Sequence, residues 1–178
     1  MCIRDSSYAV PSYIGHGTNA YTTSQLARYA TAIATSGNVY DLTLLDRQTD
    51  SKGNTLKKYE PDIINTVDVS QNVWDDIHDG MYRVVQTHRQ FDGLGVDVAG
   101  KTGTAEVNVY HPNHGMFVGY APASDPEYAI AVRIENGYTS GNACLAADDI
   151  FKYIFELTDE KSILTGVAAS DTSSTSND

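Results

Sequence analysis

The stretch that decides the fold is Val98–Glu106, which reads VAGKTGTAE. It lies in the first of three segments that are rich in Val, Ile, Tyr and Thr, the residues favoured in strands. The three segments are 96–110, 115–122 and 128–135. HPNH at 111–114 and ASDP at 123–126 join them and have the length of hairpin connections. The pattern predicts a three-stranded antiparallel meander.

Helical patterns lie on both sides of these strands. Thr22–Gln25 has the form of a capping box, and apolar residues follow it at helical spacing. A second apolar stripe runs from about 71 to 88, after Ser70 as a candidate N-cap. A third begins at about Asn142. Between the first two helices, the polar segment 46–61 is predicted to turn at Lys52-Gly53-Asn54.

These elements predict an α+β fold, in which an antiparallel sheet is packed with helices and the C-terminal helix lies on the sheet. With 178 residues the chain has the length of one ordinary domain. We divide it into an unassigned start at 1–14, a folded part at 15–157 and a tail at 158–178. The tail ends in a run of Ser, Thr and Asp, which predicts disorder.

Composition excludes several classes of function. The net charge is −11, from 23 acidic and 12 basic residues, which argues against a nucleic-acid partner. Cys2 and Cys144 are too few for a disulfide framework. No apolar run reaches the roughly 18 residues of a membrane span, and the start has no signal-peptide core. We expect no anchor or signal in this chain.

Lys101-Thr102-Gly103 is one of three sequence motifs of penicillin-binding proteins and class A β-lactamases. Alone it is weak, because a chain of this length contains the tripeptide by chance roughly a few per cent of the time. Its context is more specific, since HGMFVGYAP follows at 114–122 and IGHG at 14–17 precedes the capped helix. In this order the chain resembles the class B penicillin-binding proteins, the monofunctional DD-transpeptidases, over about Ile14 to Leu157. NGYTSGN at 136–142 is similar to their elongation-type branch.

The resemblance implies the fold of penicillin-binding proteins and serine β-lactamases, present here in part, and a role for each residue of the strand. Lys101 would place a positive charge near the substrate carboxylate and the nucleophile, and Thr102 and Thr104 would donate hydroxyl hydrogen bonds to that carboxylate. Gly103 would let the substrate backbone come close. The Thr104 amide would form half of an oxyanion hole. Lys101 and Thr104 are thus the catalytic candidates, and Thr102, Gly103 and Thr104 the substrate-binding ones, without a metal or organic cofactor.

Parts of the expected site are missing from the sequence. No Ser-x-x-Lys occurs, so neither the nucleophile nor its base is present. Two Ser-Gly-Asn triplets, at 36–38 and 140–142, are better explained as helix capping than as catalytic motifs. His111 and His114 straddle a hairpin without a third ligand, so we expect no metal site there. We expect this polypeptide alone to supply one wall of the site and to be inactive.

For the intact parent, the resemblance implies a bacterial DD-transpeptidase that cross-links peptidoglycan stem peptides through a serine acyl-enzyme. β-Lactams would be its inhibitors, the upstream part of the same domain its partner, and the cell-wall elongation complex a further candidate partner. It would work at the extracytoplasmic face of the cell membrane, anchored upstream. Two alternatives stay open: another serine acyl-enzyme (a β-lactamase, DD-carboxypeptidase or β-lactam sensor), and a non-catalytic module of the same fold. Apolar faces left uncovered predict marginal stability or self-association.

Overall fold

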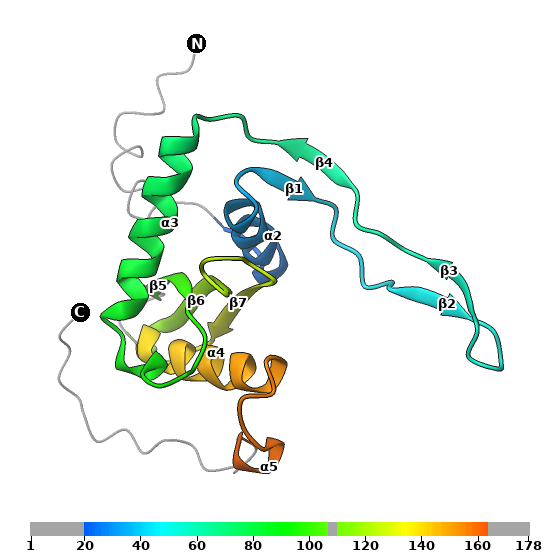
Figure 1. Cartoon of the computed structure of the whole chain (residues 1–178). Coiled ribbons are helices and arrows are strands. Elements are labelled where there is room, and N and C mark those ends of the chain that lie inside the picture. Colours follow the sequence, from blue (N-terminus) through cyan, green and yellow to red (C-terminus); the bar gives the residue numbers. More distant parts are fainter. Residues whose placement is uncertain (1–19, 107–109, 164–178) are drawn as a thin grey trace.

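The structure, a computed structural model, describes residues 20–106 and 110–163. Figure 1 shows a small sheet with helices on both faces and a long two-stranded arm that extends away from it. The IGHG segment at 14–17 lies outside the described residues, as do the predicted start at 1–14 and most of the predicted tail. Of that tail, Glu160–Ile163 forms the short helix α5.

The sheet is the predicted antiparallel meander. Its strands are β5 (Ala99–Ala105), β6 (His114–Ala121) and β7 (Tyr128–Ile134), in the order β5-β6-β7. The first strand begins three residues later than predicted, because Val96 and Val98 precede it in a loop and pack on the core from there. Both pairings are antiparallel and run without a register shift.

Helices cover both faces of this sheet (Figure 1). On one face α2 (Thr23–Ala34) lies against β6 and β7, and α3 (Gln71–Gln86) lies against β5. On the other face lie α4 (Ser140–Ile154) and the short 3-10 helix η1 (Arg89–Phe91). None of the described helices combines the length and the apolar character needed to cross a bilayer.

The helices begin at or close to the residues that the sequence predicts. The capping box is present as predicted: the Gln25 amide donates to Thr22 Oγ1 at 3.2 Å, and the Thr22 amide donates to Gln25 Oε1 at 2.8 Å. Ser70 is the N-cap of α3, although its side chain makes no capping hydrogen bond. The third predicted helix, α4, begins at Ser140, two residues before the predicted start.

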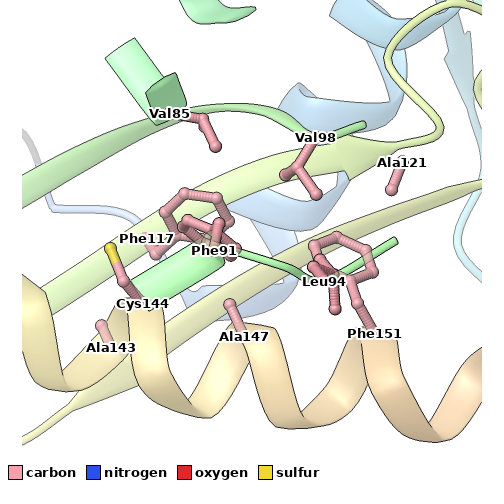
Figure 2. Packing of buried hydrophobic residues seen from close by; sticks show 10 residues of the cluster. All are labelled: Val85, Phe91, Leu94, Val98, Phe117, Ala121, Ala143, Cys144, Ala147 and Phe151. Carbon is pink, nitrogen blue, oxygen red and sulfur yellow. The ribbon is translucent and has the colours of Figure 1, made fainter. Parts of the chain in front are cut away.

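Two apolar clusters fill the spaces between the layers. The cluster toward α4 is drawn in Figure 2, where Ala143, Ala147 and Phe151 of the helix point toward the sheet. The rings of Phe91 and Phe117 lie 5.2 Å apart in this cluster. The cluster toward α2 and α3 consists of Ile33, Trp74, Met81, Ala99 and Tyr120. Phe117 and Tyr120 are three residues apart on β6, so the strand period sends them to opposite faces.

The arm is a feature that the sequence analysis missed. β1 (Asn38–Tyr40) pairs with β4 (Ile63–Thr66), and further out β2 (Arg47–Thr49) pairs with β3 (Thr55–Lys58). Segment 46–61 was predicted as a polar stretch with a turn, and the turn is correct: the Asp50 carboxylate accepts from the Lys52 and Asn54 amides. The strands beside it are three or four residues long and exposed on both faces, so they show no alternation.

Apolar side chains are exposed on this arm and its connections, namely Leu42, Leu44, Leu45, Leu56, Ile63, Ile64, Val67 and Val69. Uncovered apolar surface of this kind favours association. Self-association or marginal stability of the isolated chain therefore stays a prediction.

The buried thiol of Cys144 gives a measure of folding. The side chain is fully buried, and burial raises its pKa from 9.0 to about 12. With Cys2 replaced by serine, we expect Cys144 to resist iodoacetamide at pH 8, because a thiol of that pKa is ionised in only about one molecule in 10,000. Mass spectrometry after timed labelling, with and without urea, measures this. Equally fast labelling without urea would contradict the described packing.

The same thiol predicts a pH dependence. Its pKa is raised on folding, so its contribution to stability is complete below pH 9 and is lost progressively between about pH 9 and pH 12. The urea midpoint should therefore fall over that range, and Cys144→Ala should make the fall shallower. A Cys144→Ala profile parallel to that of the parent would contradict the assignment.

Candidate functional site

The Lys-Thr-Gly segment lies in the middle of β5 and is fully extended. Lys101 lies opposite Val118 of β6, and Thr104 lies opposite Gly115. β5 is the outer strand of the sheet, so among the described strands none pairs with its other edge. The strand therefore presents one side of its backbone, and the side chains along it, to whatever lies beside the sheet.

The strand period places the candidate residues on two faces. Lys101 and Gly103 share their face with Ala99, which packs in the cluster under α2 and α3. Thr102 and Thr104 share the opposite face, the one that α4 covers. The structure therefore does not bring the lysine and the two hydroxyls together on one face. They can act on one ligand only at the open edge, where side chains of both faces can reach it.

Lys101 is an exposed cation. Its Nζ donates a hydrogen bond of 2.7 Å to the carbonyl oxygen of the neighbouring Thr102. Within the described ranges no carboxylate lies within ion-pair distance of it, whereas Arg28, Arg47 and Lys58 each pair with an acidic side chain. An unpaired ammonium beside an open strand edge attracts an anionic ligand.

Gly103 is not required by the packing of this chain. Among the described residues, a Cβ built there would meet only Met116 Cβ, at 3.6 Å, which is ordinary contact. At Gly100 an added Cβ would lie 2.4 Å from the Phe117 ring, and at Gly115 it would lie 2.3 Å from the Thr139 carbonyl oxygen. The absence of a side chain at Gly103, which is half-buried, thus leaves room for at least a methyl group beside the strand.

Thr104 makes a contact that the sequence did not reveal. Its Oγ1 accepts a hydrogen bond of 3.3 Å from the backbone amide of Ser140, the first residue of α4. The turn before that helix has an unusual backbone, with positive φ at Asn136 (53°) and Tyr138 (64°). Asn-Gly at 136–137 is a sequence signal for such a turn, but nothing local in the sequence points to Thr104.

His114, which the sequence analysis considered as a possible metal ligand, has a structural role. His114 Nδ1 accepts a hydrogen bond of 3.1 Å from the Asn136 amide and so joins the start of β6 to the turn after β7. In the described part of the chain no three His, Cys, Asp or Glu side chains are placed to hold a metal ion.

A small hollow at the start of β5 is lined by Val85, Gln86, His88, Phe91, Asp92, Val96, Asp97 and Val98. It includes none of the four candidate residues, which lie on the open edge.

The family of the chain follows from comparison with known proteins. Residues 6–156 match the family model described as the penicillin binding protein transpeptidase domain. The chain belongs to this family. The resemblance to class B penicillin-binding proteins and the partial transpeptidase fold are thereby confirmed.

Individual relatives agree with this assignment. The peptidoglycan D,D-transpeptidase MrdA of Acinetobacter baumannii is 33% identical over 159 residues, which cover 79% of this chain and 23% of that protein. The D,D-transpeptidase domain of a peptidoglycan glycosyltransferase from Eggerthella lenta is 31% identical, with a TM-score of 0.67 over 87% of this chain and 36% of that one. Penicillin-binding protein A of M. tuberculosis, solved as an imipenem acyl-enzyme, is 26% identical, with a TM-score of 0.72 over 88% of this chain and 35% of that one. The chain thus spans about a quarter of the length of the curated relatives it matches.

Alanine at two glycines distinguishes a position with room for a side chain from one whose space is needed for packing. We expect Gly103→Ala to leave the free energy of unfolding within about 0.5 kcal/mol, because the new methyl meets only ordinary contact. Gly115→Ala should lower it by about 1–3 kcal/mol, because the methyl collides with the Thr139 carbonyl. Urea unfolding followed by circular dichroism measures both. Equal losses for the two variants would contradict the distinction.

Proposed function

We propose that this chain forms one wall of the acyl-transfer site of a peptidoglycan DD-transpeptidase. One observation carries the proposal: among residues 20–106 and 110–163 the outer edge of β5 is open, and it presents Lys101 without an acidic partner beside Thr102, Gly103 and Thr104, in a chain of the penicillin-binding protein transpeptidase family. An exposed cation, two hydroxyls and a glycine along one extended edge suit a peptide that ends in a carboxylate.

Each residue takes a role in that reaction. The Lys101 ammonium attracts the terminal carboxylate of the stem peptide, and the hydroxyls of Thr102 and Thr104 donate to it. Gly103 lets the peptide lie close against the strand. The Thr104 amide is proposed as one donor of the oxyanion hole, which stabilises the negative oxygen that develops on the attacked carbonyl.

The rest of the chemistry belongs to the intact parent. A serine upstream of this chain attacks the penultimate D-Ala carbonyl and expels the terminal D-Ala, which leaves an acyl-enzyme. An amino group from a neighbouring strand then attacks that ester and releases the serine, so one amide bond has replaced another. A β-lactam is opened by the same serine. The acyl-enzyme complex of M. tuberculosis penicillin-binding protein A, at 26% identity, supports this proposal.

The setting of the parent is also a proposal. We infer that it works at the extracytoplasmic face of the membrane, anchored upstream of this chain, with stem peptides as substrates. The NGYTSGN segment supports a role in the cell-wall elongation complex. The two alternatives, another serine acyl-enzyme and a non-catalytic module, gain no support from the relatives described above, which are transpeptidases and penicillin-binding proteins.

Labelling with a fluorescent penicillin tests the proposal. We expect the complete protein, expressed from its whole reading frame, to form a covalent adduct stable in denaturing gels, and the 178-residue chain alone to form none. Covalent label on the chain alone would overturn the assignment of the nucleophile to the upstream part. A complete protein that is not labelled would overturn the proposed function, and one that hydrolyses the penicillin rapidly would favour a β-lactamase.

Lys101→Ala in the complete protein tests the role of the cation. We expect the second-order rate of acylation to fall roughly 100-fold, which is the loss that follows removal of one electrostatic group from a site of this kind. Lys52→Ala is the matched control, because Lys52 is an exposed lysine at the tip of the arm. Equal rates for the two variants would contradict the role of Lys101.

A further inference from the structure

A residue of the candidate site, Thr104, accepts a hydrogen bond from the first turn of α4. Thr139 is the N-cap residue of this helix, and its side chain makes no capping hydrogen bond. The first amide of the helix, that of Ser140, donates instead to Thr104 Oγ1 across 36 positions of sequence. The amides of a helix's first turn have no partner within the helix, and here one of them is satisfied by the strand that carries the Lys-Thr-Gly segment.

The approach of the helix to the strand depends on Gly115. This residue lies opposite Thr104 on β6, and a Cβ on it would lie 2.3 Å from the Thr139 carbonyl oxygen. The peptide that joins Thr139 to Ser140 therefore passes directly over Gly115, beside Thr104. Any side chain at position 115 would push that peptide away from the Thr104 hydroxyl.

The turn between β7 and α4, which leads into this peptide, is fixed by two further hydrogen bonds. The Tyr138 amide donates to the Asn113 carbonyl oxygen at 3.0 Å, which joins the turn to the residue before β6. Asn142 Nδ2 donates to the Gly137 carbonyl oxygen at 2.9 Å, which joins the turn to the helix. The Ser140 amide is consequently fixed in position relative to β5 and β6.

The direction of this hydrogen bond decides what Thr104 can do. A hydroxyl has one proton to donate and two lone pairs, whereas an amide can only donate. Because Thr104 Oγ1 accepts from Ser140, its own proton must point elsewhere. The partial positive charge at the start of α4 and the linked hydrogen bonds both make that proton a better donor to an anion. At 3.3 Å the bond is long, so its main effect is on orientation.

We propose that the Ser140 amide is a positioning group that holds the Thr104 hydroxyl as a hydrogen-bond donor to the carboxylate of the ligand. The inference rests on the proposed function and adds a second element, the helix α4, to a site that the sequence assigns to β5 alone. On this proposal Gly115 contributes to ligand binding, because the absence of a side chain there lets the Thr139–Ser140 peptide lie beside Thr104.

Ser140→Pro tests the proposal because it removes the amide proton and puts the ring Cδ in its place, where the Thr104 hydroxyl can no longer stay. Proline is favoured at the first position of a helix, and Thr139 has the extended backbone (φ −136°, ψ 160°) that a residue before proline adopts. Ser140→Ala is the matched control, because it shortens the same side chain and keeps the amide. In the complete protein we expect the second-order rate of penicillin acylation to be about tenfold lower in Ser140→Pro than in Ser140→Ala.

The ligand and a second substitution separate positioning from a structural defect. A penicillin esterified at its carboxyl lacks the anion, so its acylation rate should be the same in Ser140→Pro and Ser140→Ala. In a Thr104→Val background, which has no hydroxyl to orient, Ser140→Pro should cause no further loss with the free acid. Equal losses for the acid and the ester, or an undiminished loss in the Thr104→Val background, would overturn the proposal.

Hydrogen exchange in the 178-residue chain gives a readout that does not depend on the proline variant. The Ser140 amide should exchange faster in Thr104→Val than in Thr104→Ser, which keeps the hydroxyl, and identical exchange would overturn the contact. Acylation of the parent protein distinguishes a failure of the proposed function from a failure of the role of Ser140. If it is not acylated at all, the proposed function and the inference fail together. If it is acylated and Ser140→Pro matches Ser140→Ala, the inference alone fails.

Discussion

The pairing of β5 with β6 is the constraint on which the rest of the structure depends. The register runs unbroken from Ala99 opposite Tyr120 to Ala105 opposite His114. A slip of one residue would exchange the faces of a whole strand. It would turn Phe117 away from the cluster toward α4, and it would part Thr104 from the start of that helix. The core and the candidate site are therefore fixed by the same set of hydrogen bonds.

Glycines divide this pair of strands into a packed part and an open part. Gly100 and Gly119 lie opposite each other and make room for the ring of Phe117, and Gly115 makes room for the peptide before α4. These three positions have no space for a side chain because the chain's own atoms occupy it. Gly103 differs, because in the part of the chain that the structure describes an added Cβ would meet only Met116, at an ordinary distance. The packing accounts for three of the four glycines, and for the fourth, Gly103, the proposed site supplies a reason.

Sequence reasoning found the features that depend on local pattern. The strand around Lys101 and the capping box at Thr22 could both be predicted, because strand composition and capping residues act over a few positions. The arm was missed because β2 and β3 are exposed on both faces, and a strand without a buried face has no hydrophobic alternation to detect. The contact between Ser140 and Thr104 joins residues far apart in sequence, and only the packing of α4 on the sheet brings them together.

An open strand edge is usually a liability, because its unpaired amides and carbonyls invite another strand to add. Charged side chains along an edge oppose such pairing, and Lys101 is an exposed charge at this edge that no acidic side chain of the described residues pairs with. The Thr104 hydroxyl is already engaged by the Ser140 amide, which fixes the direction in which it can bind. A short, extended ligand with an anionic end would neutralise the Lys101 charge and accept from the Thr104 hydroxyl. A neutral strand that paired with this edge would leave the Lys101 ammonium without a counter-charge. The residues proposed to bind a peptide carboxylate would thus also keep the edge free of other strands, so the proposed binding and the protection of the edge favour the same side chain at position 101.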